Sequence, residues 1–128
     1  MQRSSGIIMH ISSLPSPYGI GTLGEAAFDF ADFLAASGQK YWQVLPVGPT
    51  GYGDSPYQCF SSFAGNPYFL DLDKLREDGL LTRAEIESVD WGTDEQRVDF
   101  GKIYNGRFPL LEKAFSRFER NEELDDFL

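Results

Sequence analysis

Residues 48–58 bring together side chains that suit the binding of a sugar. They read Gly-Pro-Thr-Gly-Tyr-Gly-Asp-Ser-Pro-Tyr-Gln, with three glycines and two prolines that exclude a helix or an inner strand. A tyrosine ring packs against the apolar face of a sugar, and short polar groups bind its hydroxyls. Two interpretations remain open on composition alone: a carbohydrate-binding loop, or a structured turn whose tyrosines pack on the chain's own core.

The elements before this loop predict a β-α-β unit. Residues 6–11 and 41–45 are short apolar runs typical of buried strands. Between them, residues 23–37 are predicted to form a helix that begins at the Thr-x-x-Glu capping box of Thr22 and ends at Gly38. Strands joined in this way are parallel, and α/β proteins bind ligands at the carboxyl ends of such strands. The loop leaves that edge, which favours the binding interpretation.

The second half of the chain is predicted to be mainly helical. A further short strand is expected at 67–72, short helices at 72–78 and 82–88, and a long helix at 99–120 that Pro109 should kink or restart. Another amphipathic helix is expected to begin at the end of the chain. Two or three inner parallel strands need more covering helices than these, so the chain resembles the first part of a larger α/β protein.

Composition excludes several classes of partner. Eleven Lys and Arg against 20 Asp and Glu give a net charge of -9, which disfavours nucleic acid and anionic membranes. The single cysteine, Cys59, cannot form an internal disulfide, and one His with one Cys excludes a zinc cluster. The opening apolar run is too short for a signal peptide, and no window approaches the roughly 18 apolar residues of a membrane span. A cytoplasmic location is therefore expected.

Three other features carry competing interpretations. Residues Gly19 to Gly24 match the G-x-G-x-x-G dinucleotide fingerprint, but seven residues separate them from the strand and no acid ends the second strand. Asp54 is interpreted as an Asx-turn residue in preference to a nucleophile, because a glycosidic mechanism needs a second carboxylate. His10, near the end of the first strand, either bonds a sugar hydroxyl or is a satisfied core histidine.

Four segments together resemble the N-terminal part of the 4-α-glucanotransferases, or amylomaltases, of glycoside hydrolase family 77. In one-letter code they are HISSLPSPYGIG at 10–21, YWQVLP at 41–46, GPTGYGDSPYQ at 48–58 and FAGNPY at 63–68. The resemblance continues at 98–100, at Tyr104 and at 125–126, and is weakest over 77–97.

The resemblance implies an α/β fold, the N-terminal part of a (β/α)8 TIM barrel with a helical insertion. Residues 1–72 would hold the first βαβ unit and the substrate loop, and residues 73–128 a mostly helical subdomain. The family transfers α-1,4-glucan segments to the 4-hydroxyl of an acceptor through a covalent glycosyl-enzyme. Its two aspartates and one glutamate that perform the chemistry would lie beyond Leu128, so no catalytic residue is expected in this chain.

What the resemblance places in this chain is part of the sugar cleft. Tyr57 and Ser55 match residues near the glucan in the active cleft, and Tyr52 and Tyr104 match aromatics of a second glucan groove. Asp54 is expected to shape the loop. The family implies no metal or organic cofactor, and its partners are maltooligosaccharides and amylose; the oligomeric state stays open. A non-catalytic glucan-binding module and a fragment of a dinucleotide-binding oxidoreductase are the alternatives.

Overall fold

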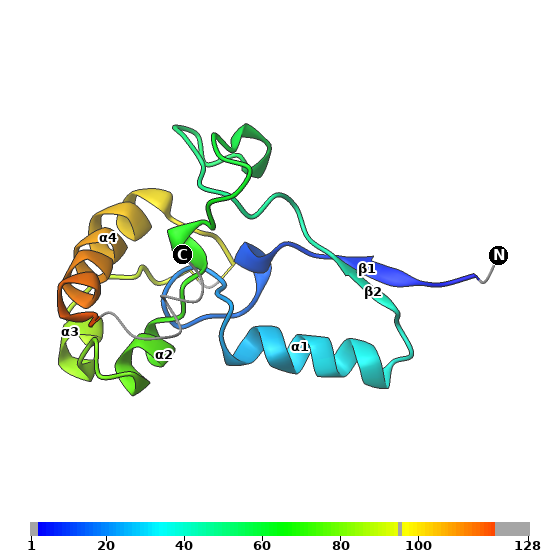
Figure 1. Ribbon diagram of the computed structural model, residues 1–128, viewed down its shortest axis with the longest axis horizontal. Helices are drawn as coiled ribbons and strands as arrows, with labels where there is room; N and C mark the ends of the chain where they lie inside the picture. The colour runs from blue at the N-terminus through cyan, green and yellow to red at the C-terminus, as the bar shows by residue number, and fades with distance from the viewer. Residues whose placement is uncertain (1–2, 95, 120–128) are drawn as a thin grey trace.

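The structure is a computed structural model that describes residues 3–94 and 96–119. The expected helix at the chain end and the resemblance at 125–126 lie outside the described residues. Two groups of elements are visible in Figure 1: a strand pair with a long helix beside it, and the remaining α-helices gathered at the other end.

The predicted β-α-β unit is confirmed. β1 (Gly6–Ile8) pairs in parallel with β2 (Tyr41–Gln43), with Gly6 opposite Tyr41, and α1 (Glu25–Ala36) connects them. Both strands are shorter than predicted. The Met9 N–H still donates to the Gln43 carbonyl at 3.0 Å, and the chain then turns into a 3-10 helix at Ile11–Ser13. This turn carries the residues after β1 across the carboxyl edge of the sheet.

The start of α1 differs from the prediction. Gly24 is the N-cap, and the Thr22 hydroxyl instead donates to a carboxylate oxygen of Asp71 at 2.6 Å. The hydroxyl bonds a charged carboxylate and Gly24 takes the N-cap position, so the tertiary contact stands where the capping box was predicted. The end of the helix is as predicted: Gly38 has a φ of +73°.

Residues 67–72 do not form the predicted strand. Pro67–Phe69 is a 3-10 helix, because the Asn66 side chain accepts the Tyr68 N–H at 3.0 Å and turns the chain. α2 (Leu72–Glu77) follows with Asp71 as its N-cap. α3 (Arg83–Glu87) begins at the predicted capping box, in which Thr82 and Glu85 bond each other's backbone N–H.

α4 (Phe100–Arg117) runs as one helix through Pro109, so the predicted restart is wrong. Its buried residues follow helical spacing on both sides of the proline, so the two halves present one continuous face to the core. They are Ile103, Arg107, Leu110 and Ala114. Ile103 belongs to a core shared with α1 and the Pro67–Phe69 turn, whereas Leu110 and Ala114 belong to a second core with α2 and α3.

The architecture supports part of the fold expectation. The described residues contain one βαβ unit followed by helices, as expected for a piece of a larger α/β domain, and they do not themselves form a closed barrel. The division at residue 72 stays a prediction. No helix in 3–94 or 96–119 is long and apolar enough to cross a bilayer.

Candidate functional site

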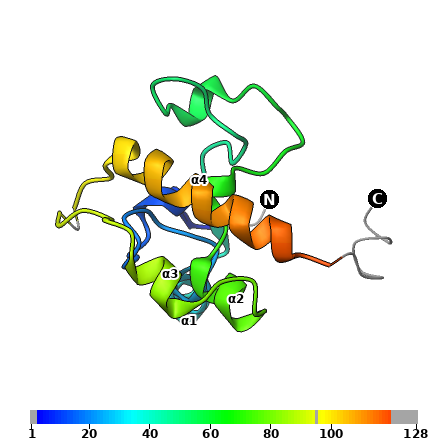
Figure 2. The same ribbon diagram turned by 90° about the vertical axis from the view of Figure 1, so that its left-hand side faces the viewer.

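Residues 47–66 form a closed loop that stands away from the helices (Figure 2). Its neck is joined by the Asn66 N–H, which donates to the Val47 carbonyl at 2.8 Å, and by an antiparallel bridge between Thr50 and Cys59. The loop's large aromatic side chains are exposed: Tyr52, Tyr57, Phe60 and Phe63. The interpretation in which the tyrosines pack on the chain's own core is therefore wrong.

A hollow of about 250 Å³ lies at the carboxyl ends of the two strands. We call it the strand-end pocket; polar groups converge on it from His10, Ser12, Thr50, Asp54 and Asn66. It is the size of a single sugar ring, and its mixture of apolar walls and a few polar groups suits one.

His10 is half-buried in this pocket, with its ring edge-on to Phe69 at 5.3 Å between centroids. Burial lowers the pKa of the imidazole, so the ring is neutral at pH 7. Its buried Nδ1 has no hydrogen-bond partner among the described residues. His10 is therefore not a core histidine whose ring nitrogens are all hydrogen-bonded, because Nδ1 lacks a partner.

A second hollow, of about 700 Å³, lies between loop residues 50–54 and the start of α4. We call it the tyrosine groove, since Tyr52, Tyr68 and Tyr104 line it. The Tyr104 ring rests on Phe108 at 5.0 Å, and Phe108 in turn lies 5.7 Å from the Tyr68 ring. The groove and the strand-end pocket share four lining residues, which makes them one continuous surface: Thr50, Asp54, Tyr68 and Phe100.

Asp54 lies where the two hollows meet. Its φ of +52° is a left-handed backbone conformation, and its N–H donates to the Gly51 carbonyl at 3.2 Å. Within the described part of the chain its carboxylate accepts no backbone N–H, so the predicted Asx-turn is wrong. After burial, the negative charge of Asp54 is the next largest cause that raises the pKa of Tyr68.

The structure brings some predicted site residues together and leaves others apart. Tyr52, Asp54 and Tyr104 line the tyrosine groove, and the Tyr104 side chain is 60% exposed there. Ser55 and Tyr57 line neither hollow; Tyr57 lies on a 3-10 helix at Pro56–Gln58 with its side chain 74% exposed. The predicted role of these two residues stays a prediction.

Tyr68 and Phe100 line both hollows and are not among the site residues predicted from the sequence. Tyr68 was assigned to a strand, although the Asn-Pro pair before it signals a turn that redirects the side chain. Phe100 is the first residue of α4, directly after the N-cap Asp99. The start of the predicted helix is the sequence feature that could have pointed to Phe100 as a lining residue.

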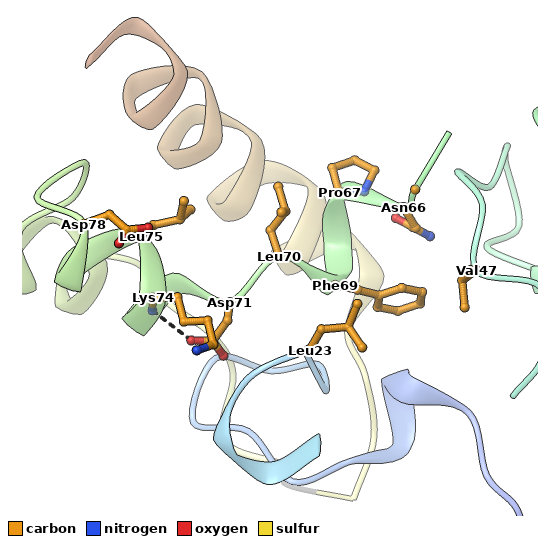
Figure 3. A pocket seen from close by; sticks show the side chains of 11 residues that line it. Leu23, Val47, Asn66, Pro67, Phe69, Leu70, Asp71, Lys74, Leu75 and Asp78 are labelled. Atoms are coloured by element: carbon orange, nitrogen blue, oxygen red, sulfur yellow. Dashed lines mark hydrogen bonds between the residues drawn. The ribbon is translucent and has the colours of Figure 1, made fainter. Parts of the chain in front are cut away.

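A third hollow, of about 480 Å³, lies between the base of the loop, the start of α1 and α2 (Figure 3). Its walls are mostly apolar and include Leu23, Val47, Leu70 and Leu75. The Asp71 carboxylate is already engaged by the Lys74 N–H at 3.0 Å and by Thr22. With few free polar groups to orient hydroxyls, this hollow suits a sugar less well than the strand-end pocket.

The glycines of the apparent dinucleotide fingerprint have packing roles. A side chain at Gly21 would collide with the Ile11 carbonyl, and one at Gly24 with the Asp71 carboxylate. That carboxylate occupies the N-terminus of α1, where a pyrophosphate would need to bind, and would repel it. The nucleotide interpretation of Gly19 to Gly24 is therefore not supported. In 3–94 and 96–119, no three His, Cys, Asp or Glu side chains come together as a metal site requires.

Comparisons with known proteins agree on one family. The family model described as 4-alpha-glucanotransferase matches residues 9–128. The 4-alpha-glucanotransferase of Streptococcus pneumoniae (serotype 4) is 57% identical over 126 residues, which cover 98% of this chain and 25% of that protein. The Thermus thermophilus 4-alpha-glucanotransferase is 52% identical over 119 residues, which cover 93% of this chain and 23% of that protein.

A solved structure shows the same relationship. The amylomaltase from Streptococcus agalactiae in complex with acarbose is 44% identical, with a TM-score of 0.91, over 99% of this chain and 26% of that one. The chain thus spans about a quarter of the length of the proteins that it resembles.

Proposed function

Because the chain belongs to the 4-alpha-glucanotransferase family, we propose that it forms the N-terminal part of an enzyme that transfers α-1,4-glucan segments between sugars. In this proposal the donor glucan is cleaved with retention through a covalent glycosyl-enzyme, and an acceptor 4-hydroxyl replaces water. The carboxylates that perform these steps lie in the remaining part of the enzyme, and this chain supplies one side of the substrate cleft.

The observation that carries the proposal is the continuous surface at the carboxyl edge of β1 and β2. There a sugar-sized pocket with neutral His10 passes into a groove lined by tyrosine rings. The net charge of -9 suits a neutral ligand. The acarbose bound by the Streptococcus agalactiae amylomaltase is consistent with a ligand of this class for the present chain.

We assign different parts of the glucan to the two sets of residues. Ser55 and Tyr57 contact glucose units in the active cleft, which the exposed Tyr57 ring reaches once the remaining part of the enzyme is in place. Tyr52 and Tyr104 bind a more distant part of the chain in the tyrosine groove. Asp54 shapes the loop between them. A cytoplasmic location belongs to the same proposal, and cell fractionation followed by an activity assay would test it.

The direct test is maltotriose disproportionation by the full-length enzyme. Incubation with maltotriose should release glucose together with longer maltooligosaccharides, and Tyr57→Ala should lower kcat/KM for this reaction by about tenfold, the loss of one stacking contact. Tyr57→Phe retains the ring and serves as the matched control. Absence of any longer product from the wild-type enzyme would refute the transferase assignment.

A further inference from the structure

Arg107 stands out among the buried residues of α4 because it is the charged one. Its side chain is 0% exposed, and its Nη2 donates to the Leu70 carbonyl. Neither Nε nor Nη1 has a hydrogen-bond partner in the described part of the chain. Burial lowers the pKa of the guanidinium to about 10, which the charge of Asp71 partly offsets. The group remains a cation at pH 7.

Burying this cation opposes folding. A guanidinium that leaves water without a full set of partners loses solvation that one carbonyl does not replace. A buried ion of this kind can often be exchanged for an apolar residue without loss of stability, so packing alone does not explain its presence. The position of Arg107 on the helix suggests another explanation.

Arg107 lies on the buried face of α4 at the boundary between the two cores. One turn before it, Ile103 packs in the core shared with α1; one turn after it, Leu110 packs in the core shared with α2 and α3. Apolar contacts on either side would allow α4 to slide or rotate by a small amount, because they have little directional preference. The hydrogen bond from Arg107 to the Leu70 carbonyl is directional, so it favours a single position of α4 along its neighbours.

The partner of this bond belongs to a segment that fixes several elements. Leu70 and Asp71 connect the Pro67–Phe69 turn to α2 (Figure 3). The Asp71 carboxylate caps α2 through the Lys74 N–H and accepts the Thr22 hydroxyl just before α1. Arg107 therefore anchors α4 to the place where the starts of α1 and α2 are held together.

The position of the α4 side chains that line the tyrosine groove depends on the same bond between Arg107 and Leu70. Tyr104 lies one turn before Arg107, and its ring rests on Phe108, which follows Arg107 directly. Phe108 contacts Tyr68, and Tyr68 lies two residues before Leu70 in the anchoring segment. A shift of α4 along this segment would carry Tyr104 and Phe108 together past Tyr68 and change the width of the tyrosine groove.

We propose that Arg107 is a positioning residue for α-glucan binding in the tyrosine groove: its bond to the Leu70 carbonyl sets where Tyr104 stands opposite the loop that carries Tyr52. This inference rests on the proposed function, because it assumes that the groove binds a glucan. It gives the buried cation a role that an apolar residue of similar volume would not fill.

The test is a double-mutant cycle in the full-length enzyme, with maltoheptaose affinity measured by isothermal titration and turnover measured on saturating maltotriose. Arg107→Met should weaken maltoheptaose binding by about five- to tenfold, as expected for removal of a coupled positioning contact, and leave kcat within about twofold. Arg107→Lys retains a donor and should restore most of the affinity. In a Tyr104→Ala background, Arg107→Met should have no further effect on affinity.

Each outcome decides the proposal. Equal losses from Arg107→Met with and without Tyr104, or unchanged affinity in the Tyr104-containing enzyme, would show that Arg107 does not act through the groove. If Arg107→Met fails to fold, Arg107→Lys takes its place in the same cycle: a partial loss that disappears in the Tyr104→Ala background supports the proposal, and additive losses overturn it. A wild-type enzyme that binds maltoheptaose but does not disproportionate maltotriose would refute the transferase activity alone.

Discussion

The two walls of the tyrosine groove are built in opposite ways. Tyr52 is fully exposed on a loop whose turn contains Gly53 at a φ of +97° and Asp54 at +52°. Tyr104 is on α4, with its ring supported by Phe108 and the helix anchored by its buried face. The loop wall is held at its neck by backbone hydrogen bonds, whereas the helix wall is held along its length by packing.

This difference predicts how each wall contributes to binding. A ring already held in its bound position loses little conformational entropy when a ligand arrives, whereas a ring on a loop must be ordered at that moment. We therefore expect the helix wall to supply more of the affinity and the loop wall to adapt to the glucan.

The largest effect is expected from Gly48→Ala, which disrupts the loop wall. A methyl group at Gly48 would collide with the Cys59 sulfur and come within 2.7 Å of the Ser61 carbonyl, so the neck of the loop must open. Overpacking of this kind costs up to about 3 kcal/mol, and because the displaced loop carries Ser55 and Tyr57 as well as Tyr52, maltoheptaose affinity should fall more than tenfold. Isothermal titration of the full-length enzyme measures it.

The matched control for Gly48→Ala is Gly65→Ala in the same loop. A methyl group there has open space within 4 Å, so its affinity should match that of the wild-type enzyme. Equal effects of the two substitutions would show that the loop is not held at Gly48.

Pro109→Ala should stabilise the helix wall. Pro109 is exposed inside α4 and removes one backbone hydrogen bond. Alanine should raise the local stability of α4 by about 2 kcal/mol, after allowance for the greater freedom of the unfolded chain. Hydrogen exchange of α4 amides should slow accordingly, while glucan affinity stays constant. Pro17→Ala, in an exposed loop, is the control; unchanged exchange in α4 would contradict the account of this helix.

Tyr104→Ala and Tyr52→Ala compare the two walls directly. Loss of the aromatic contact at Tyr104 should weaken maltoheptaose binding by about tenfold. At Tyr52 the loss should be about threefold, because the entropy cost of ordering the loop offsets part of the affinity that this contact contributes. Tyr→Phe at each position retains the ring and should change little. A larger loss at Tyr52 than at Tyr104 would reverse the assignment of rigid and adaptable walls.

Asp54→Asn should have the smallest effect, a change in the pKa of the Tyr68 phenol. The carboxylate of Asp54 disfavours the Tyr68 phenolate and raises its pKa, so removing that charge should lower the pKa toward 10.0. A raised folded pKa stabilises the protein below pH 10, and this stabilisation is lost as the pH rises through the folded value. Because the folded phenolate is less disfavoured in the variant, the variant should lose less stability than the wild-type protein as the pH rises above 10. Tyrosine Cζ chemical shifts measure the pKa; an unchanged value would show that Asp54 does not face Tyr68.

Local patterns in the sequence predicted the elements that depend on neighbouring residues. The parallel βαβ unit, the capping box of Thr82 and Glu85 and the end of α1 at Gly38 all follow from residues a few positions apart. The loop was identified because glycine and proline exclude regular structure in any context.

Contacts between distant residues were not predictable in this way. Thr22 was expected to cap α1 but bonds Asp71, 49 positions later. Arg107 is of a residue type that is seldom fully buried, yet it is fully buried here. Tyr52 and Tyr104 were assigned to one groove by resemblance; their shared position here depends on the packing of α4 against the Pro67–Phe69 turn, which no local pattern encodes.

The most direct test of the central claim is a crystal structure of the full-length enzyme with maltoheptaose. Glucose rings should stack on Tyr52 and Tyr104, with sugar carbons within about 4 Å of each tyrosine ring. Maltoheptaose bound elsewhere, with no sugar between these two tyrosines, would contradict the assignment of the tyrosine groove to glucan binding.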